Sequence, residues 1–204
     1  YCQIDLISQS FAVLSPEADA AKTNAAFTAA VSRLYDPDHR LIRLFDPPFE
    51  NARPSPGYIE SYGPGFRENG GQYTHGAVWL VMALLKQNRP DEALPLLEAL
   101  LPSNRDQALY AAEPYVLSAD ICANPDCAGR AGWSWYTGSA GWLWRVVLED
   151  LLGLRLENGE ISFAPRLPSG WTSVSVTLRG KTGKNRAFTL RSDGSWSEQS
   201  GPRS

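Results

Sequence analysis

The alternation of apolar and polar residues divides the chain into a long helical part and a shorter β part. Apolar residues recur at helical spacing over residues 4–14 and again over residues 20–34. Ser15 and Pro16 are expected to open the second of these helices, and Asp19 suits the positive end of its dipole. Further helices are predicted over residues 75–86, after the turn at 87–90, and from about residue 139 to residue 152.

After Gly153 the pattern changes to that of β-strands. The segment LRLENGEISF predicts two short strands around an Asn158-Gly159 turn. Every second residue is also apolar at Val174, Val176, Leu178, Phe188 and Leu190. We therefore predict a mainly α fold with a C-terminal β part, divided into residues 1–153 and residues 154–204.

Two long irregular stretches, at residues 35–65 and 110–138, separate the predicted helices. The first is rich in proline, and its aromatic residues favour an ordered loop over a disordered one. Each stretch leads into a segment that mixes glycine with aromatic and polar residues in front of a helix. We expect these two segments, residues 58–75 and 113–138, to build the functional site.

Composition and charge exclude two classes of partner. The 204 residues carry a formal net charge of -3, and the cations form no basic stripe that would follow a nucleic acid. No apolar run approaches the ~20 residues that cross a bilayer. The first residues, YCQIDLISQS, lack the features of a signal peptide and begin inside an expected helix. We therefore expect a cytoplasmic piece of a longer chain.

The three cysteines, Cys2, Cys122 and Cys127, give no complete set of metal ligands. One C-x4-C pair without a second pair or a nearby histidine is a poor zinc site, and an odd number is a poor disulfide framework. We expect Cys122 and Cys127 to be free loop thiols in a reducing compartment.

A helix start and a histidine offer a site for an anion. Thr137, Gly138 and Ser139 stand where a helix begins, and the free N–H groups there favour a phosphate. Alternatively, Thr137 or Ser139 only caps its own helix. His75, at the start of another helix, can donate a ring nitrogen to an anion, or can be a structural histidine bound to loop carbonyls. The other histidine, His39, is expected in a solvated turn.

Carboxylates and tryptophans near the two segments allow sugar chemistry. A glycosidase needs two carboxylates on either side of the bond, and the spacing singles out no pair among Glu60, Glu68, Glu113 and Asp120. Each can instead bind a sugar hydroxyl or pair with Arg67 or Arg130. Four tryptophans suggest a platform for sugar rings: Trp133, Trp135, Trp142 and Trp144. Their spacing places some on opposite faces, so we expect several of them in the core.

Several long motifs in order resemble the C-terminal part of glycoside hydrolase family 94, the inverting sugar phosphorylases. They are DLISQSFAVLS, RLIRLFDPPFE, PGYIESYGPGFRENGGQYTHGAVW, EPYVLSADI, GRAGWSWYTGSAGWLWR and LGLRLENGEISFAPRLPSGW. The resemblance covers roughly residues 1–171. It is strongest to the C-terminal region of bacterial cyclic β-1,2-glucan synthases and weaker to cellobiose and chitobiose phosphorylases.

The resemblance implies a fold and a reaction. The chain would hold the last helices of an (α/α)6 barrel, followed by part of a small β-sandwich. Inorganic phosphate would attack a β-glucosidic bond, giving α-glucose 1-phosphate without any cofactor. The family's phosphate site maps onto His75, Thr137 and Gly138. The sugar side would be lined by Tyr62, Arg67, Glu68 and Glu113.

The resemblance also implies that the site is incomplete. The family's general acid lies in a DWNDG-like motif that this sequence lacks, so we expect no catalytic residue here and a general acid upstream of Tyr1. The isolated chain is then expected to be inactive and to associate through apolar faces on helices 4–14 and 75–86. Upstream segments can anchor the parent in an inner membrane. Two alternatives stay open: a non-catalytic glucan-binding module, and an inverting hydrolase.

Overall fold

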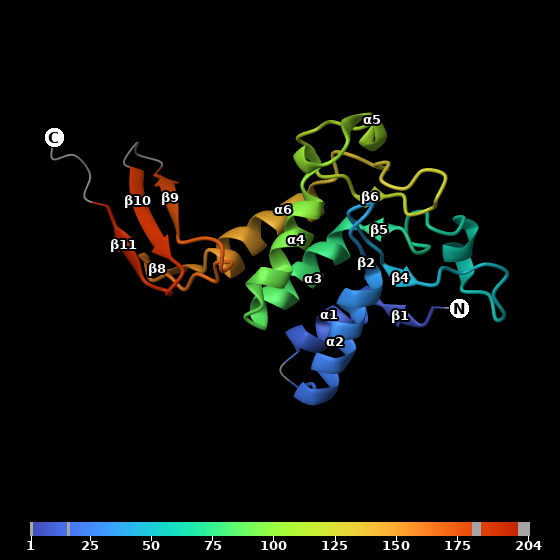
Figure 1. Cartoon of the computed structure of the whole chain (residues 1–204), viewed down its shortest axis with the longest axis horizontal. Coiled ribbons are helices and arrows are strands. Elements are labelled where there is room, and N and C mark those ends of the chain that lie inside the picture. Colours follow the sequence, from blue (N-terminus) through green and yellow to red (C-terminus); the bar gives the residue numbers. More distant parts are fainter. Residues whose placement is uncertain (1, 16, 181–184, 200–204) are drawn as a thin grey trace.

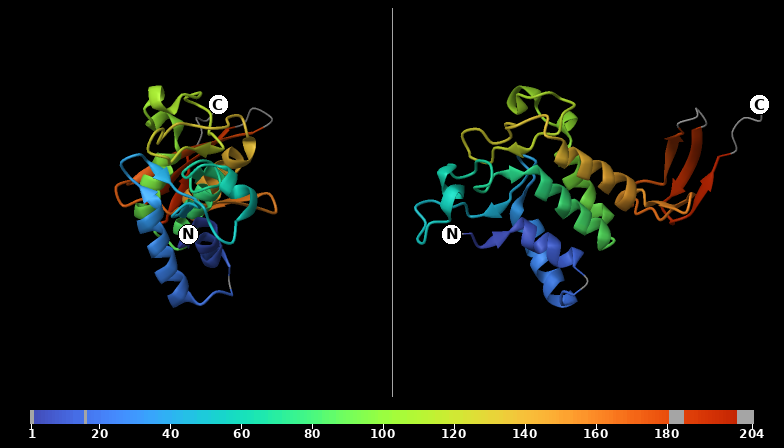
Figure 2. Two further views of the ribbon diagram at one scale, coloured as in Figure 1. Left: turned by 90° about the vertical axis from the view of Figure 1, so that its right-hand side faces the viewer. Right: turned by 180° about the vertical axis from the view of Figure 1, so that it is seen from behind.

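The helical part and the β part lie at opposite ends of an elongated molecule (Figures 1 and 2). We describe a computed structural model of the chain, which covers residues 2–15, 17–180 and 185–199. Helix α6 (Thr137–Arg145) and a π-helical turn, η3 (Val146–Leu151), join the two parts. A helical N-terminal part followed by small antiparallel sheets confirms the predicted fold class at this level.

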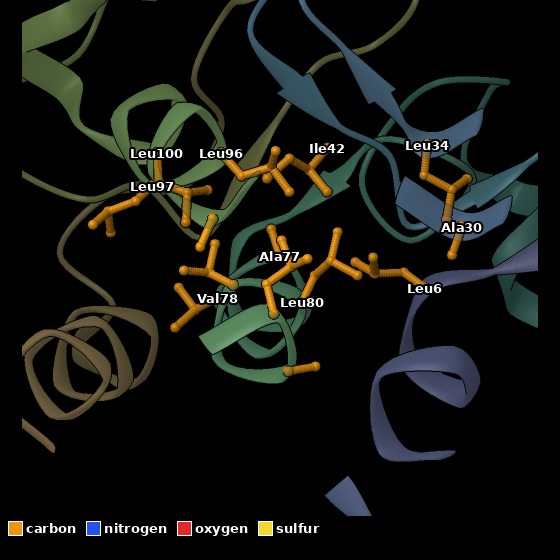
Figure 3. Packing of buried hydrophobic residues seen from close by; sticks show 14 of the residues in the cluster. Leu6, Ala30, Leu34, Ile42, Ala77, Val78, Leu80, Leu96, Leu97 and Leu100 are labelled. Carbon is orange, nitrogen blue, oxygen red and sulfur yellow. The ribbon is translucent and has the colours of Figure 1, made fainter. Parts of the chain in front are cut away.

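Helix α3 (Thr74–Lys86) is the centre of the helical part. It packs against α1 (Leu6–Leu14), α4 (Pro90–Leu100), α6 and η3, and α2 (Ala20–Leu34) packs against α1. Side chains from these helices meet in one apolar cluster (Figure 3). Most of α3 is fully buried, and the expected exposed apolar face is reduced to Trp79 and Met82, which are partly buried.

Two helix starts differ from their predictions. A short strand, β1 (Ile4–Asp5), precedes α1, and Asp5 caps this helix by accepting a hydrogen bond from Ser8 N at 2.8 Å. Helix α2 begins at Ala20 because Asp19 caps it, accepting from Lys22 N at 2.8 Å. Ser15 ends α1 instead of opening α2. Pro16 lies outside the described residues.

Short elements order the two irregular stretches. The first contains β2 (Tyr35–Asp36), β3 (Leu41–Ile42), β4 (Phe45–Asp46) and the 3-10 helix η1 (Gly57–Ser61), and β5 (Gln72–Tyr73) follows it directly before α3. Between α4 and α6 lie η2 (Pro102–Asn104), α5 (Gln107–Tyr110) and β6 (Asp120–Ile121). Strands β5 and β6 pair antiparallel, with Tyr73 opposite Asp120. This pairing fastens one predicted site segment to the other.

The β part begins with the predicted hairpin. Strands β7 (Leu154–Glu157) and β8 (Glu160–Phe163) flank Asn158 and Gly159, whose φ angles of 51° and 83° suit a type I′ turn. Strands β9 (Ser173–Arg179), β10 (Asn185–Arg191) and β11 (Trp196–Glu198) form an antiparallel sheet. A second apolar cluster, which includes Phe163 and Phe188, is shared by these strands.

The cysteine expectation is also wrong. Cys122 and Cys127 form a disulfide, and Cys2 is a free thiol. A turn brings the pair together, because Cys127 N donates to Asn124 O at 3.0 Å and Gly129 N donates to Cys122 O at 2.9 Å. Spacing alone did not reveal this turn. In the described ranges, no helix is long and apolar enough to span a membrane.

Candidate active site

A cavity of about 270 Å³ lies where the two site segments meet. The β5–β6 pairing and a hydrogen bond from Thr74 N to Ala119 O at 3.0 Å hold its two walls together. The residues that line it come from both segments: Arg67, Glu68, Tyr73, His75, Ala119, Tyr136, Gly138 and Ser139. Four predicted site residues, Arg67, Glu68, His75 and Gly138, therefore share one cavity.

His75 faces the first turn of α6. A Cβ atom built on Gly138 would lie 3.6 Å from both Nδ1 and Cε1 of the His75 ring, so this glycine leaves the ring room at the helix start. The ring stacks parallel to Tyr73 at 6.2 Å and lies 4.6 Å from the ring of Trp79. Trp142 follows at 6.1 Å. These aromatic neighbours fix the orientation of the imidazole.

The His75 imidazole is partly buried and has one nitrogen without a partner among the described residues. Its Nε2 atom is buried and has no hydrogen-bond partner within the described part of the chain. Burial lowers the pKa of His75, because desolvation disfavours the charged ring. A structural histidine bound to loop carbonyls would have used this nitrogen. The described part of the chain thus leaves one polar atom of this ring unsatisfied.

The start of α6 has little side-chain capping. Tyr136, at the N-cap, makes no capping hydrogen bond through its side chain. The Oγ atom of Ser139 is buried and has no partner among the described residues. Thr137 is the first residue of the helix. The first N–H groups of α6 therefore stand at the cavity with a positive dipole end, which favours an anion.

Arg67 and Glu68 also line the cavity. Arg67 has a left-handed backbone with φ 48°, and its guanidinium lies 5.3 Å from the Tyr62 ring centre and 4.8 Å from the Trp133 ring centre. Its Nε atom is 3.6 Å from Glu68 Oε2. Both of these atoms are buried without a hydrogen bond to any described residue. Tyr62 thus contacts Arg67 and does not line the cavity itself.

Other polar residues of the first segment serve the fold. Asn69 is fully buried, donating to Phe49 O at 2.9 Å and to Tyr62 O at 2.7 Å, and accepting from Phe49 N at 2.8 Å. Gln72 is also buried and accepts from Ile42 N at 3.0 Å. A Cβ atom on Gly71 would meet the Arg67 backbone at 2.8 Å. The ENGGQ motif therefore holds a tight loop that presents Arg67 and Glu68.

Asp120, on β6, holds the loop that contains Trp133. Its Oδ1 atom accepts from Trp133 N at 3.2 Å, and its carboxyl group fills the space where a Cβ atom of Gly132 would be. Burial raises the pKa of Asp120, although the hydrogen bond from Trp133 and the charge of Arg67 oppose this. Asp120 therefore fixes the loop that places Trp133 against Arg67.

Glu113 and Glu60 lie apart from the cavity. Glu113 Oε1 accepts from Trp135 Nε1 at 2.7 Å, and Glu113 borders a different hollow with Ala112 and Ser134. Glu60 accepts a hydrogen bond from Ala52 N. The structure thus does not bring these two carboxylates together around one bond.

The expectation that several tryptophans are buried in the core is wrong. Trp133, Trp135 and Trp144 are 52%, 65% and 66% exposed. Sequence reasoning also missed three residues of the cavity wall, Tyr73, Ala119 and Tyr136. The pairing of Tyr73 with Asp120 is a long-range contact, and no local pattern indicated it. Tyr136 could have been found from its position directly before the helix start.

Comparison with known families identifies the class of protein that carries this site. The chain belongs to the glycosyl hydrolase 94 superfamily, because residues 1–153 match its catalytic domain. Residues 154–181 match the C-terminal domain of glycosyl hydrolase family 65. The resemblance predicted from the motifs is confirmed.

Three relatives illustrate the range of the family. The cyclic β-(1,2)-glucan synthase NdvB of Rhizobium meliloti is 46% identical over 183 residues, which are 87% of this chain and 6% of that protein. The solabiose phosphorylase of Paenibacillus borealis is 30% identical over 88% of this chain and 24% of its own length. The N,N'-diacetylchitobiose phosphorylase of Vibrio proteolyticus is 30% identical over 88% and 23%. The chain thus spans a quarter or less of these relatives.

Proposed function

We propose that this chain forms the phosphate side of an inverting sugar phosphorylase site. The observation that carries the proposal is His75, whose ring lines the cavity with Nδ1 and Cε1 toward Gly138 at the start of α6, and whose Nε2 has no partner among the described residues. A ring N–H donor, free helix N–H groups and a glycine that admits close approach suit an oxyanion. Family membership favours inorganic phosphate as that oxyanion.

In this proposal the phosphate is both ligand and nucleophile. His75, Thr137 and the backbone at Gly138 hold it through donated hydrogen bonds, which orient one oxygen toward the anomeric carbon. A bond forms from that oxygen to the carbon while the bond to the glycosidic oxygen breaks. The electron pair leaves with the glycosidic oxygen, which takes a proton from a general acid. Attack from the opposite face gives α-glucose 1-phosphate from a β-glucoside.

We assign the sugar side of the proposed site to Arg67 and Glu68. The Arg67 and Glu68 side chains offer a donor and an acceptor that both face the cavity, and Tyr62 supports Arg67. Such groups suit sugar hydroxyls. The likeness to a cyclic β-(1,2)-glucan synthase favours a β-1,2-linked glucan as the substrate.

We assign the general acid to a part of the parent protein outside this chain. Residues 1–153 are then the end of an (α/α)6 barrel and residues 154–204 part of the β domain that follows it. Losing a general acid typically costs ~10²–10⁴-fold in rate. The isolated chain is accordingly expected to bind phosphate without turning over glucan, and to associate through faces that the rest of a barrel would cover.

The test measures glucose 1-phosphate from linear β-1,2-glucan, with and without phosphate. The 204-residue chain is compared with a longer chain that extends upstream through the expected acidic motif. Phosphate-dependent product from the longer chain alone supports the proposal, and His75→Ala in that chain should abolish it. Release of free glucose without any glucose 1-phosphate, at the same rate with and without phosphate, would show a hydrolase instead.

A second candidate function is a non-catalytic glucan-binding module. The exposed aromatic residues around the cavity favour it, because aromatic rings and nearby polar groups suit a sugar chain. Phosphate separates the two functions, since a pure binding module should retain glucan equally with and without it. The hydrolase alternative has less support, because Glu60 and Glu113 are engaged in separate places. Intact activity in both Glu60→Gln and Glu113→Gln would exclude it.

A further inference from the structure

The aromatic run between Trp133 and Tyr136 is divided between two places on the surface. Trp133 and Tyr136 pack together at 5.6 Å, and Trp133 lies against Arg67 at the cavity. Trp135 instead meets Tyr115 edge-on at 6.4 Å and donates its indole N–H to Glu113. One short segment therefore supplies two aromatic pairs.

The backbone at Trp135 accounts for this division. In an extended chain, residues two apart point to the same face, so Trp133 and Trp135 would lie together. Trp135 has φ 64°, a left-handed conformation that is costly for a bulky side chain. Strain of this kind persists when the surroundings enforce it, and it concentrates at functional sites. The 2.7 Å hydrogen bond from Trp135 Nε1 to Glu113 Oε1 is the contact that holds the ring in place.

The pair that Trp135 forms with Tyr115 is unusually open. Tyr115 is 76% exposed and Trp135 is 65% exposed, so their packing against each other leaves most of both rings in solvent. Burial therefore does not explain the strained backbone or the hydrogen bond. The pair lies where the stretch between α5 and β6 runs beside the segment that enters α6 (Figure 1). Tyr136, the next residue, lines the cavity.

We propose that Tyr115, Trp135 and Glu113 form a second glucan subsite, outside the cavity, which binds sugar units of a long chain. The two rings offer apolar faces to pyranose rings, and the carboxylate accepts hydrogen bonds from sugar hydroxyls. The inference rests on the proposed glucan substrate. It predicts that the protein distinguishes long glucans from short ones, because only a long chain reaches from the cavity to this subsite.

The experiment follows the tryptophan indole N–H signals by NMR while ligands are added. The seven tryptophans give separate indole signals, and Trp135→Phe assigns one of them. Linear β-1,2-glucan of several units should shift the Trp135 signal, whereas the disaccharide should not. Trp135→Ala and Tyr115→Ala should each weaken binding of the long glucan by about two- to tenfold and leave the disaccharide affinity unchanged. Tyr58→Ala, at a tyrosine on η1 with 69% exposure, is the matched control.

Inorganic phosphate gives a separate readout in the same spectra. It should shift the signals of Trp79 and Trp142, whose rings surround His75. If phosphate shifts these signals but long and short glucans bind alike, the subsite is overturned and the phosphate site stands. If long glucan shifts Trp135 and phosphate has no effect, the subsite stands and the phosphate site falls. The same titration is repeated on the longer chain. If Trp135 is buried there and its signal does not shift when glucan is added, the subsite is also overturned.

Discussion

The two segments that build the cavity use their side chains in opposite ways. In the first, residues 58–75, polar side chains are buried: Asn69 and Gln72 are inaccessible and bind backbone groups of distant loops. In the second, residues 113–138, apolar side chains are exposed, with Trp133, Trp135 and Tyr136 at the surface. Buried polar residues thus support the fold in the first segment, whereas exposed aromatic residues lie at the surface in the second.

The largest effect is expected from removing the buried amide of the first segment. Asn69→Ala leaves Phe49 N, Phe49 O and Tyr62 O without their partner. Leaving buried groups unsatisfied costs about 1–3 kcal/mol each, so we expect a loss of about 2–5 kcal/mol in the free energy of unfolding. Urea unfolding followed by circular dichroism measures it.

Asn24→Ala is the control for this change, because Asn24 is exposed on α2 and should alter stability by less than about 0.5 kcal/mol. If Asn69→Ala is as stable as this control, the buried amide does not support the fold, and the contrast with the exposed aromatic residues of the second segment is broken.

The second segment should respond to a single added methyl group. In Gly132→Ala the new Cβ would occupy the position of the Asp120 carboxyl group. The crowding should cost about 1–3 kcal/mol of stability and displace Trp133 from Arg67. Differential scanning fluorimetry reports the stability. Gly141→Ala, in α6 with open space at its Cβ position, is the matched control and should not destabilise the protein.

A third change separates binding from stability. The Cβ atom of Gly138→Ala would lie 3.6 Å from the His75 ring, an ordinary contact, so the free energy of unfolding should change by less than about 0.5 kcal/mol. The same methyl group lies between the ring and the helix start, where the proposed anion binds. Phosphate affinity should fall roughly tenfold, measured by calorimetry. Equal phosphate affinity in the variant would place the anion elsewhere.

Local patterns predicted much of this molecule, and long-range contacts supplied the rest. Helix periodicity located α3 and α4, and Asn158-Gly159 located the hairpin, because both depend on neighbours in the sequence. The motifs around His75 and Gly138 placed both residues at helix starts, and the structure adds that the two starts face one cavity.

Other features were not predictable from local sequence. The burial of Asn69 depends on carbonyls at Phe49 and Tyr62, and the outward direction of Trp135 depends on a left-handed backbone and on Glu113. The Cys122–Cys127 disulfide depends on a turn that spacing alone did not reveal. Each feature arises from a contact that only the folded chain creates.

The smallest predicted effect concerns the proton on His75. Burial lowers the pKa of His75 in the folded protein, so the unfolded chain binds a proton first as the pH falls. The contribution of His75 to stability is therefore complete above its ordinary pKa of 6.5 and is lost as the pH decreases toward its folded pKa.

An anion at the site opposes this effect of burial on the pKa of His75, because a negative charge favours the protonated ring. Sulfate, which does not titrate in this range, should consequently raise the pKa of His75. The chain has two histidines, so NMR can follow both rings, and His39 in its exposed turn serves as the internal control. If sulfate leaves the pKa of His75 unchanged, no anion binds beside this ring. His75 is then a structural residue, like the buried polar residues Asn69 and Gln72 of the same segment.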